Sequence, residues 1–116
     1  MNLQNLTKSE LKAWAEVQPI PNLADDPSLY FILDDPRLQL TEIAKLSPRR
    51  PPEDDPGSVH RAMVLAHAAA QGFIPKRKPI SVRQKPDGGF AILDGTSTYG
   101  AAIGAGWRKL PVIIEE

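Results

Sequence analysis

The chain has 116 residues, no cysteine, and a net charge of zero from 14 basic and 14 acidic residues. This length suits one ordinary domain, and the lack of cysteine excludes disulfides, thiolate metal sites and thiol catalysis. The longest apolar stretch, 63–70, is far shorter than the roughly 20 residues that cross a bilayer, and residues 1–5 lack the features of a signal peptide. We therefore expect a soluble, cytoplasmic protein with no membrane contact.

Charge and proline are both unevenly distributed along the chain. Residues 76–114 carry seven basic and two acidic residues, a net charge of +5, whereas residues 1–75 carry a net charge of −3. Eight of the 12 prolines lie between Pro19 and Pro56, which predicts mainly irregular connections in that stretch. The neutral whole argues against a nucleic-acid coat protein, but the basic C-terminal part is compatible with a local phosphate site.

The first predicted element is a helix over residues 8–17. Thr7 and Glu10 have the spacing of a capping box, in which each side chain accepts a hydrogen bond from the backbone N–H of the other residue. Leu11 and Trp14 lie on one face of this helix, and the prolines that follow end it.

Residues 22–46 are ambiguous in sequence. Asp26-Pro27 and Asp35-Pro36 each have the pattern of an acidic N-cap followed by proline at the first helical position. The apolar run 29–33 fits either one helical turn or a strand, and residues 40–46 fit either a short strand or a helix.

The pattern becomes clear after residue 54. Asp55 is a good N-cap, Pro56 fits the first helical position, and Gly72 fits the position after the helix end. The period then changes to two over 79–84 and 90–93, with turn residues between these segments. This pattern predicts a β-hairpin.

The C-terminal part predicts one more helix and one more strand. Small residues dominate Thr96–Ala105, which we expect to be helical and closed by Gly106, and 111–114 is an apolar strand. The order of elements predicts an α+β fold. We expect a helical, proline-rich N-terminal extension over 1–39 and the α+β domain over 40–116.

The candidate site is the turn at which the second hairpin strand passes into that helix. The first N–H groups of a helix have no internal partner and carry its partial positive charge, so they bind anions well. Gly95 would let a ligand approach the backbone, and Thr96, Ser97 and Thr98 add hydroxyl donors. Asp94 is a candidate metal ligand or proton acceptor. The alternative is that Thr96 or Ser97 is only an N-cap and Gly95 only a turn residue.

Basic residues before and within the hairpin are the second candidate feature. Lys76, Arg77 and Lys78 precede the first strand of the hairpin, and Arg83 and Lys85 follow. We expect Lys78 and Arg83 to contribute to phosphate binding as positive charges. The alternative is a solvated loop that only favours solubility.

An ordered set of segments, and no single motif, carries a family resemblance. These segments are Ile43–Pro48, Lys78–Val82, Gly89–Gly95, Ala101-Ala102, Gly106-Trp107 and Leu110–Ile114. In this order they resemble the core of the ParB/sulfiredoxin superfamily: strand, hairpin, phosphate turn, alanine-rich helix and last strand. The resemblance implies a small mixed sheet with packed helices, preceded here by an N-terminal helical extension.

The chain departs from the family pattern at the phosphate turn. ParB proteins carry a Gly-Glu-Arg-Arg box there, and kinase-like members carry Asp-Gly-His-His-Arg. Asp94-Gly95 matches the latter, but Thr96–Thr98 replaces His-His-Arg, so the phosphate-gripping arginine must come from elsewhere, with Arg61, Arg77 and Arg83 as candidates. Sulfiredoxin activity is excluded because it requires a cysteine.

The resemblance leads to a function in which the turn binds a phosphate-bearing ligand, either a nucleotide or a nucleic-acid backbone. A nucleoside triphosphate with Mg²⁺ is the implied cofactor pair, and weak nuclease or nucleotide phosphohydrolase activity would use Asp94 as metal ligand or base. We leave open whether the protein is an enzyme. One alternative is a non-catalytic DNA- or protein-binding accessory module of a plasmid or phage. Another is an inhibitor that binds a protein partner through its N-terminal half. Because no helix-turn-helix follows Ile114, we expect no role in DNA partition.

Overall fold

The computed structural model describes residues 3–115 and confirms the α+β class. Within these residues the helices are α1 (Lys8–Glu16), α2 (Pro56–Ala70) and α3 (Thr96–Ala105), with short 3-10 turns at Pro27–Leu29, Ile43–Lys45 and Pro52–Asp54. The strands are β1 (Leu38–Glu42), β2 (Leu46–Ser47), β3 (Ile80–Gln84), β4 (Phe90–Asp94) and β5 (Lys109–Glu115). None of the helices in this part of the chain has the length and apolar character needed to span a membrane.

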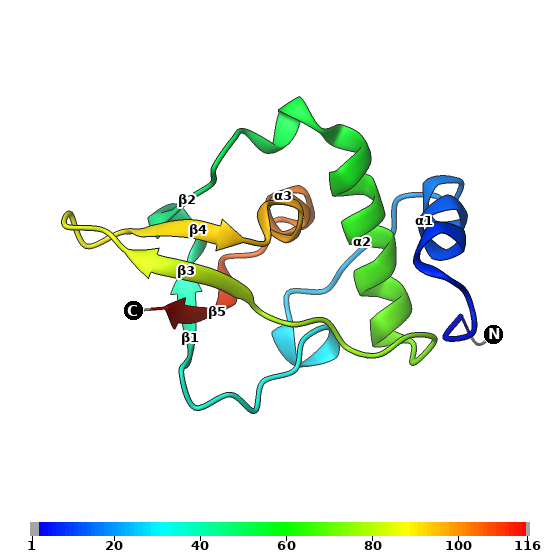
Figure 1. Cartoon of the computed structure of the whole chain (residues 1–116), viewed down its shortest axis with the longest axis horizontal. Coiled ribbons are helices and arrows are strands. Elements are labelled where there is room, and N and C mark those ends of the chain that lie inside the picture. Colours follow the sequence, from blue (N-terminus) through cyan, green and yellow to red (C-terminus); the bar gives the residue numbers. More distant parts are fainter. Residues whose placement is uncertain (1–2, 116) are drawn as a thin grey trace.

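The strands form one mixed sheet in the order β1-β5-β3-β4-β2. The pairs β1–β5 and β3–β4 are antiparallel, whereas β3–β5 and β2–β4 are parallel. The last strand, β5, therefore lies inside the sheet between β1 and β3 (Figure 1). Its apolar run suits an interior strand, and Leu110, Pro111 and Val112 are fully buried.

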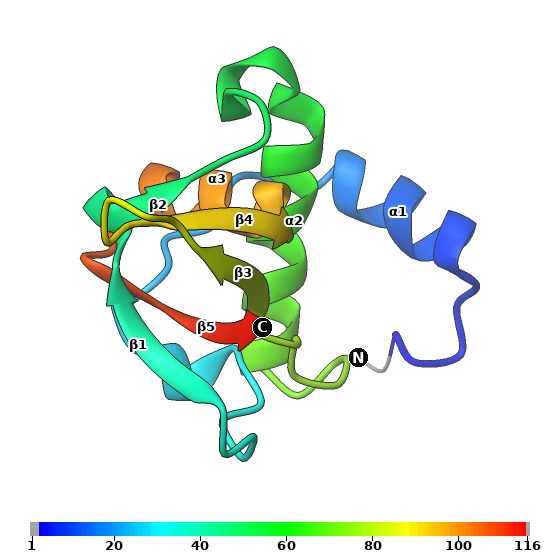
Figure 2. The same cartoon turned by 60° about the vertical axis from the view of Figure 1, so that its left-hand side comes forward.

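The helices lie at increasing distance from the sheet in the order α3, α2 and α1. In Figures 1 and 2, α3 lies next to the strands, α2 lies beyond α3, and α1 lies on the side of α2 that faces away from the sheet. The main core fills the space between sheet and helices, with Val82, Ile92, Ala102 and Val112 among its most buried members.

The segment before β1 contributes side chains to the main core and to a second apolar cluster on α2. Leu3 and partly buried side chains of α1 form a second apolar cluster with the C-terminal half of α2. Leu23, Tyr30 and Phe31 belong to the main core, and the indole Nε1 of Trp107 donates a hydrogen bond to the carbonyl of Leu23 (3.3 Å). The expected boundary between residues 39 and 40 falls within β1, and the division into two domains stays a prediction.

Most predicted helix ends are confirmed by their caps. The capping box of Thr7 and Glu10 is present, and the Asp55 side chain accepts a hydrogen bond from the backbone N–H of Ser58 at the start of α2. Gly72 and Gly106 have φ angles of +78° and +76° after α2 and α3, as expected for residues that follow a helix end.

Two expectations from the ambiguous stretch need correction. Asp35 accepts a hydrogen bond from the backbone N–H of Arg37 (2.8 Å), but a turn and then β1 follow, so it caps no helix. Residues 40–46 are neither a single strand nor a helix, because β1 ends at Glu42 and Ile43–Lys45 is a 3-10 turn that leads into β2. The pairing of β1 with β5 and of β2 with β4 determines this local structure, and the local pattern contains neither partner.

Candidate functional site

The turn between β4 and α3 depends on a glycine. Gly95 has a φ of +114°, which favours glycine, and a Cβ added there would lie 2.7 Å from the Cβ of Ile80. The backbone conformation and the contact with β3 therefore both require glycine at this position. The sequence suggested that Gly95 lets a ligand approach the backbone. The structure shows that packing against Ile80 requires glycine here even without a ligand.

The N-terminus of α3 has unpaired donors. The N–H of Tyr99 donates to the carbonyl of Gly95 (2.9 Å) and closes the first turn. The N–H groups of Thr96, Ser97 and Thr98 have no hydrogen-bond partner in the part of the chain that the structure describes. Gly95 is the N-cap and has no side chain to accept from them, so the alternative that Thr96 or Ser97 serves as the cap is wrong.

A hollow of about 220 Å³ borders this turn on the side of α2. Ser97 and Thr98 line it together with the guanidinium-bearing side chains of Arg61 and Arg77. Apolar side chains complete the lining, including Phe31, Ala101 and Trp107. The lining of the hollow therefore combines basic, hydroxyl-bearing and apolar residues, and it includes two of the three residues whose N–H groups are unpaired.

Two wider hollows border the same turn. One is lined by Arg49 and Arg50 with residues 93–97, and the other by Lys76, Arg77 and Lys78 with Asp94, Gly95 and Thr98 among others. Basic side chains from three separate segments (49–50, 61 and 76–78) thus surround the start of α3. We call this set, together with residues 94–98, the α3 site.

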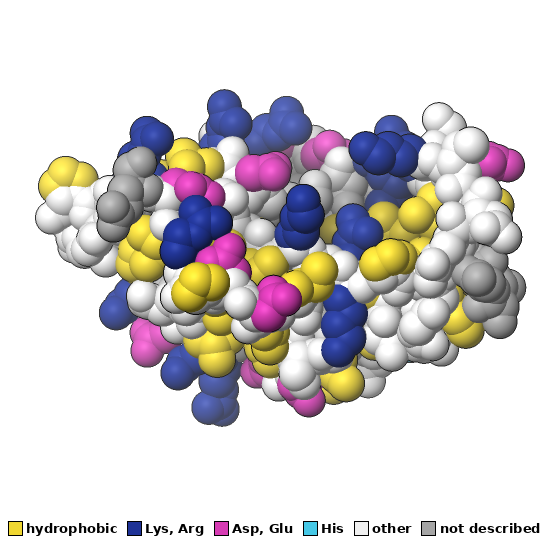
Figure 3. Space-filling model, turned by 60° about the horizontal axis from the view of Figure 1, so that its bottom comes forward, with side chains coloured by type: hydrophobic (Ala, Val, Ile, Leu, Met, Phe, Trp, Pro, Cys, Tyr) yellow, Lys and Arg dark blue, Asp and Glu magenta, His cyan; other side chains and the backbone are white. Residues whose placement is uncertain are grey.

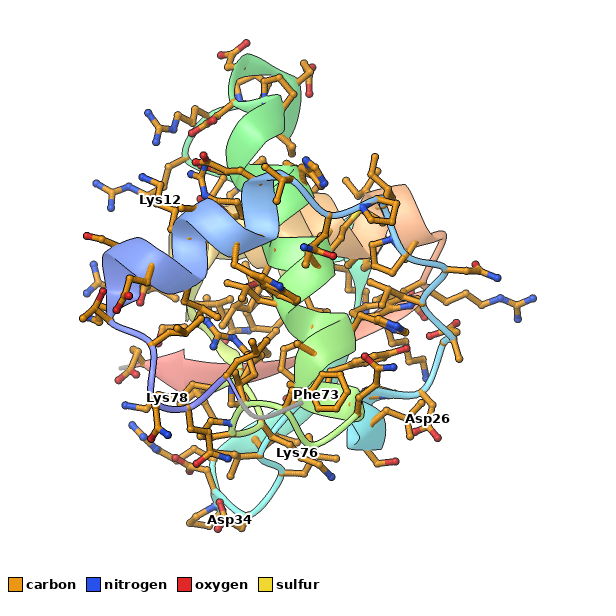
Figure 4. All side chains as sticks on the ribbon, turned by 90° about the vertical axis from the view of Figure 1, so that its right-hand side faces the viewer. Lys12, Asp26, Asp34, Phe73, Lys76 and Lys78 are labelled. Atoms are coloured by element: carbon orange, nitrogen blue, oxygen red, sulfur yellow. The ribbon has the colours of Figure 1, made fainter. Side chains whose placement is uncertain are left out.

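Main-chain contacts hold several of these basic residues in place. Nη1 of Arg49 donates to the carbonyl of Leu93 (3.3 Å), and Nζ of Lys76 donates to the carbonyl of Ser28 (2.7 Å). Figure 4 shows Lys76 and Lys78 on the connection between α2 and β3. Arg77 is anchored through its backbone and has no side-chain partner among residues 3–115.

The structure brings only part of the predicted basic set to the turn. Lys78 lines a hollow of the α3 site, and Arg61 and Arg77 do as well. Arg83 lines none of these three hollows, because it pairs with Ala91 in the sheet and follows Val82, whose side chain points into the core. The assignment of Arg83 to phosphate binding stays a prediction.

Sequence reasoning missed Arg49 and Arg50. They lie some distance along the chain from the turn, in an exposed loop with no local signal of function. The parallel pairing of β2 with β4, with Leu46 opposite Phe90, carries this loop to the end of β4. The position of Arg49 and Arg50 beside the turn could be predicted only from the strand order of the sheet.

Among the residues that line these three hollows, Asp94 is the one acidic residue. The Asp94 side chain is exposed and makes no hydrogen bond or ion pair among the described residues, and residues 3–115 contain no group of three or more His, Asp or Glu placed to hold a metal ion. The hydroxyl and backbone N–H of Ser58, with Arg61 and Arg50 nearby, lower the pKa of Asp55. On the face in Figure 3, acidic side chains lie among the basic ones, so positive charge does not dominate that face.

No protein-family model matches the chain, and no curated protein matches it. The structure is similar to the C-terminally truncated chromosome-partitioning protein ParB from Caulobacter crescentus, solved in complex with CTP-gamma-S, with 23% sequence identity and a TM-score of 0.45. The match covers 68% of this chain and 44% of the ParB chain, so this chain spans less than half of that structure. ParB belongs to the ParB/sulfiredoxin superfamily, which the sequence resembles.

Proposed function

We propose that the chain binds a phosphate-bearing ligand at the α3 site. The observation that carries this proposal is the coincidence of unpaired N–H groups at Thr96–Thr98 with basic side chains from three segments of the chain. A helix N-terminus attracts anions through its N–H groups and its dipole, and arginine adds paired donors that match phosphate oxygens.

Arg77 replaces the arginine that is missing from the turn itself. It lines two of the three hollows, and Thr98 lines both of them as well. Its N–H donates to the carbonyl of Tyr30 (2.7 Å), and its carbonyl accepts from the N–H of Ile32 (2.9 Å). The backbone is therefore fixed while the guanidinium stays available to a ligand.

The apolar lining favours a nucleotide over a bare phosphate. Phe31 and Trp107 contribute to the same hollow as Arg61 and Arg77, so a ligand with both an aromatic and an anionic part would contact both kinds of surface. Binding sites for small molecules commonly combine such apolar walls with a few polar groups. A nucleic-acid backbone is the alternative ligand with the same phosphate chemistry.

Weak catalysis at the α3 site is a second part of the proposal. Asp94 would supply one carboxylate oxygen to Mg²⁺, which proteins often hold with one or two carboxylates and the phosphates of the ligand. Mg²⁺ would offset charge on the phosphate oxygens. Asp94 is exposed at the end of β4, so water reaches it freely. Water at an exposed site screens the charges that would stabilise the transition state. We therefore expect hydrolysis to be slow and binding to be the main property.

Titration calorimetry with ATP, GTP, CTP, UTP and inorganic tripolyphosphate, with and without Mg²⁺, tests the proposal. CTP is included because the ParB structure contains a CTP analogue. We expect dissociation constants in the micromolar range or weaker. Arg77→Gln should weaken binding about tenfold, since it removes a charge-assisted hydrogen-bond donor.

The matched control is Arg108→Gln, which makes the same change of charge at an exposed residue outside the three hollows. It should leave the affinity within about twofold, because an exposed charge at a distance is screened by salt. Equal losses in both variants, or no binding to any of these probes, would contradict the proposal. Binding of an oligonucleotide but of no mononucleotide would instead favour the accessory-module alternative.

A further inference from the structure

One guanidinium is shared between the α3 site and the N-terminal helix. Nη1 of Arg61 lies 3.2 Å from Oε1 of Glu16, the last residue of α1, and Nη2 donates to Oγ of Ser58 (3.0 Å). The same side chain lines the hollow that contains Ser97 and Thr98. A ligand phosphate in that hollow and the Glu16 carboxylate would therefore compete for one cation.

The docking of α1 does not depend on this ion pair. Leu11 and Trp14 pack against the apolar cluster of α2, and Nε2 of His60 donates to the carbonyl of Gln18 (2.7 Å) just after α1. Figure 4 shows the C-terminal end of α1 beside α2. These contacts hold the helix in place and keep Glu16 near Arg61.

Glu16 also brings no benefit to its own helix. A negative charge at the C-terminal end of a helix is unfavourable, because the partial charge there is already negative. The last turn of α1 contains no basic residue that would offset it. Among residues 3–115, the ion pair of this carboxylate outside α1 is the one with Arg61.

The ion pair is weak enough for a ligand to displace it. The Glu16 side chain is 50% exposed and the Arg61 side chain 22% exposed. Ion pairs with such access to water contribute little free energy. A ligand with several negative charges, held at the same time by the N–H groups of α3, would replace Glu16 at the guanidinium.

We propose that Glu16 lowers the affinity of the α3 site for anions, so that neutralising Glu16 or releasing α1 strengthens binding. This inference rests on the proposed function of the α3 site. The carboxylate acts in two ways, since it occupies one donor of Arg61 and places a negative charge near the incoming phosphate.

The test is the affinity of Glu16→Gln for inorganic tripolyphosphate, measured by calorimetry at low salt. Glutamine keeps an oxygen that can accept from Arg61 but removes the charge. The affinity should rise about three- to fivefold, as expected when one charge is removed at short range near a protein surface. The gain should shrink with added salt, because the charges are partly exposed. Glu42→Gln, which makes the same change on β1, should leave the affinity unchanged.

Further variants separate this inference from the proposed function. In an Arg61→Gln background, Glu16→Gln should raise the affinity by less than it does in the unchanged protein, because only the repulsion between the carboxylate and the phosphate remains to be removed. A loss of affinity in Glu16→Gln would mean that the carboxylate positions Arg61, and an unchanged affinity would mean that it has no role. Either result overturns the inference while leaving the proposed function intact, provided that Arg77→Gln still weakens binding. Absence of tripolyphosphate binding in every variant overturns both.

Discussion

The ring of Tyr30 stacks on the ring of Trp107, with ring centroids 5.0 Å apart and planes 23° from parallel. Tyr30 belongs to the segment before β1, whereas Trp107 follows α3. Both side chains are buried, with 2% and 6% of their surface exposed. The N-terminal segment is therefore part of the main core, and its contacts lie close to the α3 site.

Trp107→Ala should lower the free energy of unfolding by about 3–5 kcal/mol, because it removes a large buried ring and leaves a cavity. Urea unfolding followed by circular dichroism measures this change. The control is Ile103→Ala, since Ile103 is 49% exposed and its loss should cost within about 0.5 kcal/mol. If the two variants lost similar stability, the N-terminal segment would not be docked as described.

Gly95→Ala should destabilise the protein by about 2 kcal/mol or more, since alanine is strained at this φ and its Cβ would overlap Ile80. Gly72→Ala is the matched control, because Gly72 also has a positive φ but an added Cβ would meet nothing within 4 Å. It should cost about 1 kcal/mol. Thermal unfolding of both variants separates strain from overlap, and equal losses would show that Ile80 does not pack against Gly95.

Asp55→Ala should lower the melting temperature at pH 7, because α2 loses its N-cap. The hydrogen bonds from Ser58 lower the pKa of Asp55 below its ordinary value of 3.8. The stabilisation is therefore fully present above the unfolded pKa and is lost as pH falls through the folded pKa. Melting curves from pH 7 to pH 2 should show the two proteins converging below about pH 4.

Asp54→Ala is the control for that series, since the Asp54 side chain makes no hydrogen bond within residues 3–115. Its melting temperature should stay close to that of the unchanged protein at every pH. A gap between Asp55→Ala and the unchanged protein that persisted at low pH would contradict the assigned cause.

Local sequence predicted the elements that depend on local chemistry. The capping box at Thr7, the Asp55 cap and the bounds of Thr96–Ala105 needed no tertiary information. Residues 40–46 could not be predicted, because their strand pairing is with β5 and β4, far along the chain. Tertiary pairing overrides weak local preference in such segments.

The candidate site was also predictable only where local sequence determines it. The turn at residues 94–98 has its own local signal, a strand followed by glycine and hydroxyl residues. Lys78 and Arg77 lie close to the hairpin in sequence, so charge density suggested them. Arg49 is brought to the turn by the pairing of β2 with β4. Arg83 pairs with Ala91, away from the three hollows. Neither position can be predicted from the number of charges in a segment.

Two substitutions at the turn separate catalysis from binding. Asp94→Asn should abolish any Mg²⁺-dependent release of phosphate from nucleotides, with little loss of affinity in the absence of metal. Thr96→Ala should mainly weaken binding, by about threefold, since it removes one hydroxyl donor. Phosphate release and calorimetry on both variants check this. Robust turnover that is insensitive to Asp94→Asn would contradict the role assigned to this carboxylate.

The most direct test of the α3 site is a titration of the ¹⁵N-labelled protein with a nucleoside triphosphate, followed through its amide NMR signals. We expect the N–H signals of Thr96, Ser97 and Thr98 to shift and saturate together, because these groups have no partner in the described structure and belong to residues that line the hollows. Signals of the hairpin turn at 85–89 should not move. Saturable shifts that exclude residues 95–98, or no shifts at all, would contradict the account.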